Sequence, residues 1–181
     1  YVATAKLLAQ RIPGLQILVP LVTRETRLMF EAAMYRQGAT ELPIRLLFGH
    51  AHDALGAADV ALVASGTATL EAALLKCPHV IAYKMSPVSY QIMRRMAYQP
   101  YVGLPNVLAG ELLAPEILQD QATPEALADA LLALYEDRER RSTIISRFTE
   151  IHRELRQGTA ERAANAILEG LPAGAPALAV A

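Results

Sequence analysis

Four short apolar runs, each followed by a stretch with helical periodicity, limit the folds open to this chain more than any other feature. The strand candidates are residues 15–20, 44–48, 60–64 and 80–83. Because these runs are apolar nearly throughout, both of their faces must be buried, as in parallel strands that helices cover on both sides. We therefore predict an α/β fold with a parallel sheet and helices on both faces. Ligands of such sheets bind outside the carboxyl ends of the strands.

We expect helices between the strands, and only helices after residue 110. Period and flanking glycine or proline residues predict helices at residues 1–11, 25–37, 53–57, 67–75, 87–98, 116–119, 124–135, 137–157 and 159–168. Thr123 is the expected N-cap of the helix at 124–135. The apolar segment 101–110 is expected to pack inward. We predict a sheet domain over residues 1–110, a helical extension over 111–170 and a disordered tail over 171–181.

Composition excludes several classes of protein. A chain of 181 residues with 53% hydrophobic content can bury the core of one domain. The net charge of -1, from 17 basic and 18 acidic residues, argues against binding nucleic acid through bulk charge. The single cysteine, Cys77, cannot form an internal disulfide and is expected to be buried.

No apolar run approaches the roughly 20 residues that span a bilayer, and no signal peptide is visible, so we expect a cytoplasmic protein. The helical pattern already under way at Tyr1 suggests a fragment.

The end of the run at residues 60–64 is the strongest candidate for a ligand site. Ser65 or Gly66 can begin a tight turn, and Thr67 can cap the helix that follows. The first backbone N–H groups of that helix would then face an anion such as a diphosphate. Glu71, about one and a half turns into the helix, can accept hydrogen bonds from sugar hydroxyls. The same residues also fit a plain helix cap with a solvated glutamate, so both interpretations stay open.

Several other ligand classes lack their sequence signature here. The chain contains no G-x-G-x-x-G, which disfavours a nicotinamide or flavin dinucleotide, and no G-x-x-x-x-G-K-[ST], which excludes a P-loop. Asp53 and Asp59 do not form a D-x-D pair. We therefore expect neither a metal nor a cofactor.

Three linked motifs follow one another along the chain. They are Ala-Ser-Gly-Thr-Ala-Thr-Leu-Glu at residues 64–71, Cys-Pro-His-Val-Ile-Ala-Tyr-Lys-Met-Ser-Pro at 77–87, and Tyr-Val-Gly-Leu-Pro-Asn-Val-Leu-Ala-Gly at 101–110. In this order they resemble bacterial lipid-A-disaccharide synthase, in its C-terminal half, from about residue 1 to 168. The resemblance implies the Rossmann-like C-terminal domain of a GT-B-like fold. It also implies an inverting glycosyltransferase that joins UDP-diacylglucosamine to diacylglucosamine 1-phosphate and releases UDP.

The resemblance implies a role for each residue of the first motif. Ser65, Gly66 and Thr67 would hold the UDP diphosphate through N–H and hydroxyl groups. Glu71 would accept hydrogen bonds from the ribose hydroxyls.

Four more residues join the predicted donor site. Gly49 and His50 would meet the uracil edge, mainly through backbone groups. Asn106 would face the cleft and contact a sugar hydroxyl or the diphosphate, although it can also simply close a turn after Pro105. Lys84, at a strand end, would offset the charge of the leaving diphosphate. A lysine at the edge of the sheet without such a role fits the same position.

The same resemblance divides the mechanism between two halves of the enzyme. The catalytic base is expected in the N-terminal half, so the fragment alone should be inactive. The resemblance also implies a homodimer whose two subunits exchange their C-terminal helices. It implies no nucleic-acid partner.

Acylated substrates imply a peripheral position on the inner face of the bacterial inner membrane. The segment 88–98 mixes aromatic, aliphatic and arginine side chains as an interfacial helix does, but a helix packed on the sheet fits the same pattern.

Two alternatives remain at this point. One is another UDP-sugar enzyme of the same architecture, a UDP-N-acetylglucosamine epimerase or the peptidoglycan N-acetylglucosaminyl transferase. The other is a non-catalytic α/β module that binds a partner through its C-terminal helices.

Overall fold

The strands of the protein form two parallel sheets. The computed structural model describes residues 1–64, 66–87, 89–91 and 100–170. Strand β1 (Ile17–Leu21) pairs with β2 (Ile44–Phe48), and β4 (His79–Tyr83) lies between β3 (Ala61–Ala64) and β5 (Glu116–Leu118). All pairings are parallel. The predicted α/β fold and its four strands are confirmed, but the strands are hydrogen-bonded in two groups where one sheet was expected.

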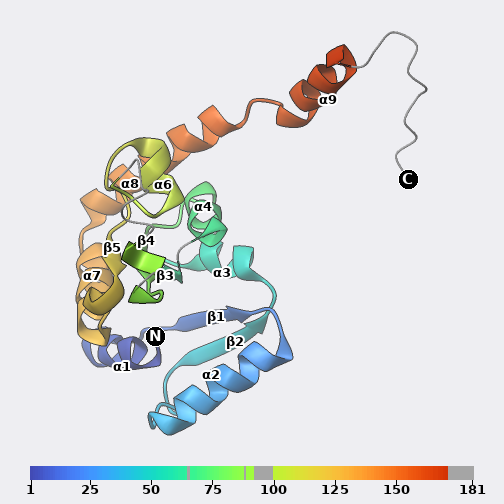
Figure 1. Ribbon diagram of the computed structural model, residues 1–181. Helices are drawn as coiled ribbons and strands as arrows, with labels where there is room; N and C mark the ends of the chain where they lie inside the picture. Colours follow the sequence, from blue (N-terminus) through green and yellow to red (C-terminus); the bar gives the residue numbers. More distant parts are fainter. Residues whose placement is uncertain (65, 88, 92–99, 171–181) are drawn as a thin grey trace.

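Helices cover both faces of the three-stranded sheet (Figure 1). On one side, α1 (Val2–Arg11) packs against α7 (Pro124–Glu136), which lies on β4. On the other side, α4 (Thr67–Leu74) contacts α3 (Ala51–Ala57), α6 (Leu104–Ala109) and α8 (Arg138–Leu155). Helix α2 (Arg24–Arg36) runs beside β1 and β2. This two-sided arrangement is the Rossmann-like layering expected from the apolar strands.

The C-terminal helices are present as predicted. Thr123 caps α7 by accepting a hydrogen bond from the Ala126 N–H at 3.2 Å, with Pro124 in the first turn. Asp137 caps α8 in the same way. Helix α9 (Thr159–Gly170) extends away from the body, and none of its residues is buried (Figure 1). Residues 171–181, where a disordered tail was predicted, lie outside the described residues.

One predicted helix is wrong. Residues 116–119 were expected to be helical, but Glu116–Leu118 is strand β5, followed by the short 3-10 helix η1 (Gln119–Gln121). Ile117 and Leu118 pair in register with Ala82 and Tyr83 of β4. Pairing with a buried neighbouring strand outweighs the local preference of so short a segment.

The core of the protein surrounds β4. Val80 and Ala82 of β4 pack with residues of α7 and α8, among them Leu131 and Phe148. The prediction that Cys77 is buried is confirmed, since 2% of the residue is exposed. Burial, with a smaller contribution from the Asp59 charge, raises the pKa of its thiol to about 12. Segment 101–110 contains α6 and packs inward as predicted through Gly103, Pro105 and Asn106, which are buried.

Candidate functional site

The turn between β3 and α4 is the centre of the candidate site. Gly66 has φ 120° and ψ -160°, a backbone conformation that side-chain-bearing residues rarely adopt. The Gly66 carbonyl accepts hydrogen bonds from the Thr69 N–H at 3.1 Å and from the Thr69 hydroxyl at 2.8 Å. Thr69 is fully buried, so the turn is held from inside the molecule. Ser65, the first residue predicted to hold the diphosphate, lies outside the described residues.

The structure corrects the role expected of Thr67. Gly66 is the N-cap of α4 and Thr67 is its first helical residue, without a side-chain cap among the described residues. Thr67 is exposed. Because no side chain among the described residues caps this end, the amides of Thr67 and Ala68 keep the hydrogen-bonding capacity, and the helix the positive dipole end, that suit an anion.

Glu71 lies one helical turn after Thr67, on the same face of α4. Its carboxylate oxygen Oε2 is 3.5 Å from Nε2 of His52, in the first turn of α3. The Glu71 side chain is 47% exposed and that of His52 is 70% exposed. A half-exposed carboxylate near the start of a helix can accept hydrogen bonds from a polar ligand.

The loop before α3, at Gly49 and His50, is hydrogen-bonded to the end of β1. The Gly49 N–H donates to the carbonyl of Leu21, the last residue of β1, at 2.9 Å. Gly49 and His50 both have left-handed φ values, 66° and 54°. His50 Nδ1 lies 2.8 Å from Oδ2 of Asp53, and both side chains are largely exposed. The backbone of this loop therefore follows β1 at the carboxyl edge of its sheet.

Lys84 directly follows β4, which pairs with β3. Its ammonium is 3.7 Å from Oδ1 of the fully exposed Asp120, and the lysine side chain is 70% exposed. The loop itself is held by Gln119, whose side chain bonds both the N–H and the carbonyl of Met85. Lys84 thus stands at the strand end where it was predicted, and its part in binding stays a prediction.

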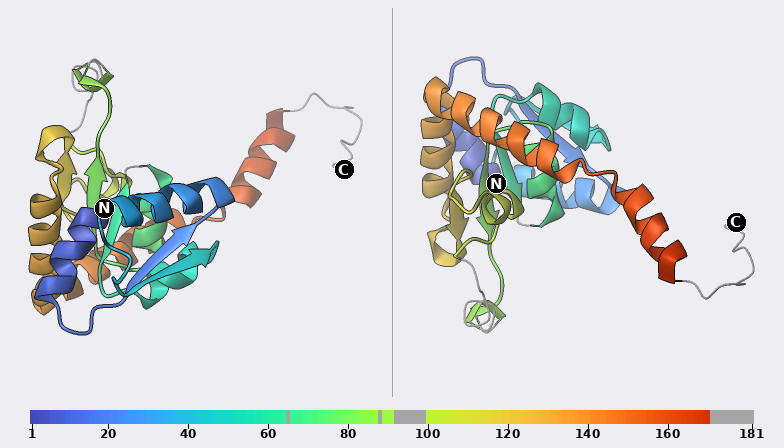
Figure 2. Two further views of the ribbon diagram at one scale, coloured as in Figure 1. Left: turned by 90° about the horizontal axis from the view of Figure 1, so that it is seen from below. Right: turned by 90° about the horizontal axis from the view of Figure 1, so that it is seen from above.

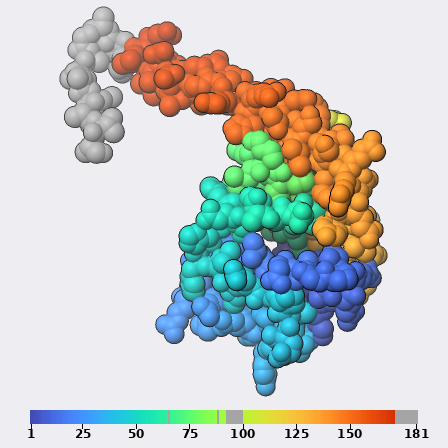
Figure 3. All heavy atoms as spheres, turned by 180° about the vertical axis from the view of Figure 1, so that it is seen from behind, coloured from blue at the N-terminus to red at the C-terminus, as the bar shows by residue number. Residues whose placement is uncertain are grey.

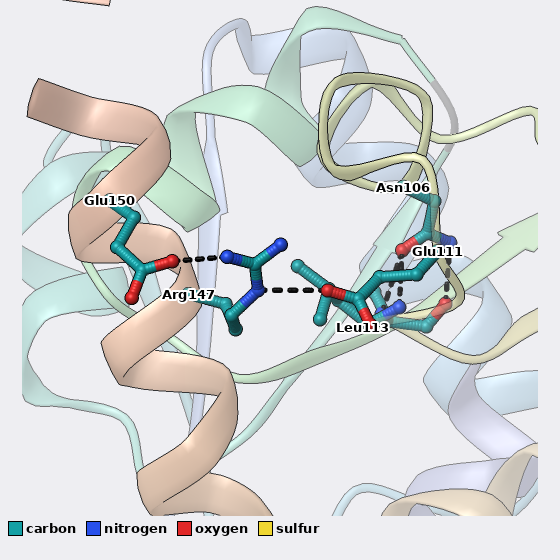
Figure 4. Close-up of polar contacts among 6 residues, drawn as sticks. Asn106, Glu111, Leu113, Arg147 and Glu150 are labelled. Atoms are coloured by element: carbon teal, nitrogen blue, oxygen red, sulfur yellow. Dashed lines mark hydrogen bonds and ion pairs between the residues drawn. The ribbon is translucent and has the colours of Figure 1, made fainter. Parts of the chain in front are cut away.

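Asn106 is placed differently from the expectation. It lies in α6, is fully buried, and does not face a cleft. Its amide nitrogen donates to the Ala114 carbonyl at 2.7 Å and to Glu116 Oε1 at 2.8 Å, and its amide oxygen accepts from the Ala114 N–H. The amide oxygen also accepts from the Leu113 N–H at 2.9 Å (Figure 4). These bonds use the donors and acceptor of the side chain inside the protein, so in this structure Asn106 organises the loop after α6.

Two polar residues around Asn106 were missed by the sequence reasoning. Glu116 also accepts hydrogen bonds from the N–H groups of Val102 and Gly103. Arg147 of α8 donates to Glu111 at 2.8 Å and also contacts Glu150 (Figure 4). A glutamate inside an apolar run, such as Glu116, was the available signal, because a carboxylate placed inside a fold must find donors.

Comparison with known proteins assigns the chain to a family. Residues 1–169 match the family described as Lipid-A-disaccharide synthetase. The chain belongs to this family. The lipid-A-disaccharide synthase of Dechloromonas aromatica (strain RCB) is 63% identical over 172 residues, which are 94% of this chain and 45% of the relative. That of Erwinia tasmaniensis is 44% identical over 169 residues, which are 93% of this chain and 44% of the relative.

The chain thus spans less than half the length of these lipid-A-disaccharide synthases. Its membership confirms the resemblance carried by the three motifs. Among the described residues, no three His, Cys, Asp or Glu side chains are grouped as metal ligands would be. No helix in the described part of the chain is both long and apolar enough to cross a membrane.

Proposed function

We propose that this chain is the donor-binding part of a lipid-A-disaccharide synthase. The proposed reaction transfers diacylglucosamine from UDP to the acceptor diacylglucosamine 1-phosphate, with inversion at the anomeric carbon. Family membership supports the reaction class. The observation that carries the site is the position of Glu71 one turn into α4, whose start has no side-chain cap among the described residues, at the carboxyl end of β3.

Each group of the site has a proposed task. The turn at Ser65–Thr67 holds the diphosphate, because helix amides stabilise negative charge without a metal. Glu71 accepts from the ribose hydroxyls, and the backbone at Gly49 and His50 meets the uracil. Lys84 offsets the charge that develops on UDP as it leaves. The base that deprotonates the acceptor hydroxyl belongs to the remaining half of the enzyme.

Two further properties are proposed with the function. Both substrates are acylated, so the enzyme would lie peripherally on the inner face of the inner membrane. Residues 88 and 92–99, most of the suggested interfacial segment, lie outside the described residues. A homodimer with exchanged C-terminal helices would cover α9, whose apolar Ile167 and Leu168 are 61% and 65% exposed.

The experiment uses a chimera in which this chain replaces the matching part of the Dechloromonas aromatica relative. Calorimetry measures UDP binding, and mass spectrometry measures disaccharide formed from UDP-diacylglucosamine and diacylglucosamine 1-phosphate. The chimera should bind UDP in preference to ADP and form the disaccharide. Glu71→Gln should weaken UDP binding about tenfold or more, because hydrogen bonds to a charged group are the stronger ones.

A control is Glu41→Gln in the exposed loop before β2, at the end of the sheet away from the site, which should leave binding and product formation unchanged. A folded chimera that binds ADP as well as UDP, or forms no disaccharide while the unaltered relative does, would contradict the proposed function.

A further inference from the structure

Two consecutive residues in the left-handed conformation, Gly49 and His50, form the turn that leads into α3. Gly49 has φ 66°, and His50 has φ 54° and ψ 29°. Glycine adopts such angles freely, whereas a residue with a side chain adopts them only at a cost in free energy. The Gly49 N–H is fixed by its hydrogen bond to the Leu21 carbonyl. The left-handed conformation of His50 requires a stabilising contact of its own.

The side chain of His50 makes that contact with Asp53. Nδ1 of His50 lies 2.8 Å from Oδ2 of Asp53, and the two side chains are 67% and 79% exposed. Because a carboxylate only accepts hydrogen bonds, Nδ1 is the donor. Among the described residues neither side chain has a second hydrogen bond or ion pair, so each is committed to the other.

The pair replaces the usual arrangement at the start of a helix. His50 is the N-cap of α3, and its carbonyl accepts a hydrogen bond from the Ala54 N–H at 3.0 Å. An N-cap residue normally has extended angles, and in a capping box the side chain three positions further on bonds its backbone N–H. Asp53 occupies that position but bonds the imidazole instead. The contact thus favours a left-handed N-cap residue over an extended one.

The peptide group between Gly49 and His50 is left without a hydrogen bond in this arrangement. Among the described residues, neither the Gly49 carbonyl nor the His50 N–H has a backbone partner, and both residues are exposed. The space-filling view shows the cyan and teal segment that includes α3 at the surface of the molecule (Figure 3). A backbone donor and acceptor are therefore available to a ligand, and the conformation of His50 sets their direction.

The turn also lies close to the carboxylate proposed to bind the ribose. Strands β1 and β2 run side by side in the same direction, and the turn follows the end of β2 (Figure 2, left). His52, two residues after His50, has its Nε2 3.5 Å from Oε2 of Glu71. In a nucleotide the base is bonded directly to the ribose. A nucleotide whose ribose meets Glu71 can therefore place its base against the turn at Gly49 and His50.

We propose that Asp53 is a positioning residue that selects the base of the donor nucleotide. Its carboxylate holds His50 in the left-handed conformation and so directs the Gly49–His50 peptide group toward the uracil. Asp53 acts only through the imidazole of His50 and does not touch the nucleotide. This inference rests on the proposed function, which places UDP at this edge of the fold.

The test compares UDP and ADP binding to the chimera and to variants of Asp53 by calorimetry. Asp53→Ala should weaken UDP binding about two- to fivefold, because exposed pairs contribute little. ADP binding should stay the same, since the two nucleotides share the ribose and the diphosphate, so the preference for UDP should fall by that factor. Asp53→Asn should retain most of the UDP binding, because the amide oxygen still accepts from Nδ1.

A matched control is Asp129→Ala, which removes the exposed ion pair of Asp129 with Arg11 and should change neither affinity. Equal losses of UDP and ADP binding in Asp53→Ala would overturn the proposal, because the base would then not be what Asp53 affects. An unchanged UDP preference in Asp53→Ala would overturn it as well.

A second variant tests whether Asp53 acts through His50. Glycine is left-handed without the support of a side-chain partner, so in the His50→Gly background Asp53→Ala should cause no further loss of UDP binding. The same loss in both backgrounds would overturn the proposal, since Asp53 would then act by another route.

NMR of the same proteins separates a failure of this inference from a failure of the proposed function. The backbone chemical shifts and the N–H to Hα coupling of His50 report its φ, which should move from left-handed toward extended values in Asp53→Ala. A His50 that stays left-handed in this variant would overturn the inference even where UDP binds. A chimera without preference for UDP, in which this shift still occurs, would contradict the proposed function and with it the selection of the base, and would support only the effect of Asp53 on the turn.

Discussion

His52 Nε2 lies 3.5 Å from Glu71 Oε2, and this contact joins the first turn of α3 to the second turn of α4. His52 therefore helps to orient the carboxylate proposed to bind the ribose. In the chimera, His52→Ala should weaken UDP binding about two- to fivefold, since exposed pairs of this kind contribute little. Calorimetry of the single variants and of the double variant with Glu71→Gln measures the coupling. Losses that simply add would mean that the two side chains act independently.

Asn106 should prove to be a stabilising residue. Asn106→Ala removes its four hydrogen bonds and leaves the buried N–H groups of Leu113 and Ala114 without their acceptor. Urea unfolding should show a loss of about 3 kcal/mol. Asn165→Ala on exposed α9 is the matched control and should cost almost nothing. An Asn106→Ala protein of unchanged stability that no longer binds UDP would instead support the ligand contact predicted from sequence.

Two glycines should respond to alanine in opposite ways. A Cβ at Gly103 would lie 2.2 Å from Cδ1 of Ile81, so Gly103→Ala should lower the free energy of unfolding by about 1–3 kcal/mol. At Gly56, within α3, a Cβ meets nothing within 4 Å. Gly56→Ala should therefore raise the free energy of unfolding by about 0.5–1 kcal/mol, since alanine favours the helix. Thermal and urea unfolding measure both, and equal effects at the two sites would contradict the packing described here.

The buried His79 should make stability fall in mild acid. Its Nδ1 lies 2.9 Å from the Cys77 carbonyl, an acceptor, so Nδ1 carries the proton; Nε2 is buried without a partner among the described residues. Burial lowers the pKa of His79 below its usual 6.5. The hydrogen bond to the Cys77 carbonyl raises the pKa, but by less than burial lowers it. In the unfolded chain the imidazole gains a proton near pH 6.5, while the folded one stays neutral. The free energy of unfolding should thus decrease below pH 6.5, by at most about 1.4 kcal/mol per pH unit, until the folded pKa is reached.

The check on His79 is urea unfolding between pH 5 and pH 8, with His79→Phe for comparison. Phenylalanine retains a ring that can stack on Phe148, whose centroid is 5.5 Å from that of His79, and it does not titrate. The variant should lose this part of the pH dependence. An identical slope in both proteins would assign the acid sensitivity to other groups.

Local sequence patterns were enough to predict most elements of the fold. The apolar runs at β1 to β4 and the cap residue Thr123 act through neighbours close in the chain, which is why their positions could be predicted. The turn at Gly66 and the carboxylate of Glu71 were likewise found from the pattern of one strand, turn and helix. The capping role of Thr67 was wrong because the bonds of the turn come from Thr69, which the same pattern allows equally well.

The sequence by itself determined the alternation of strands and helices, the cap at Thr123 and the family motifs, because each depends on residues a few positions apart. Only the tertiary structure decided that Glu116 begins a strand, that Asn106 is sealed in the core, and that β1 and β3 remain unpaired across a cavity. These outcomes depend on hydrogen-bond partners and neighbouring strands supplied by distant parts of the chain. Period and propensity carry no information about such partners.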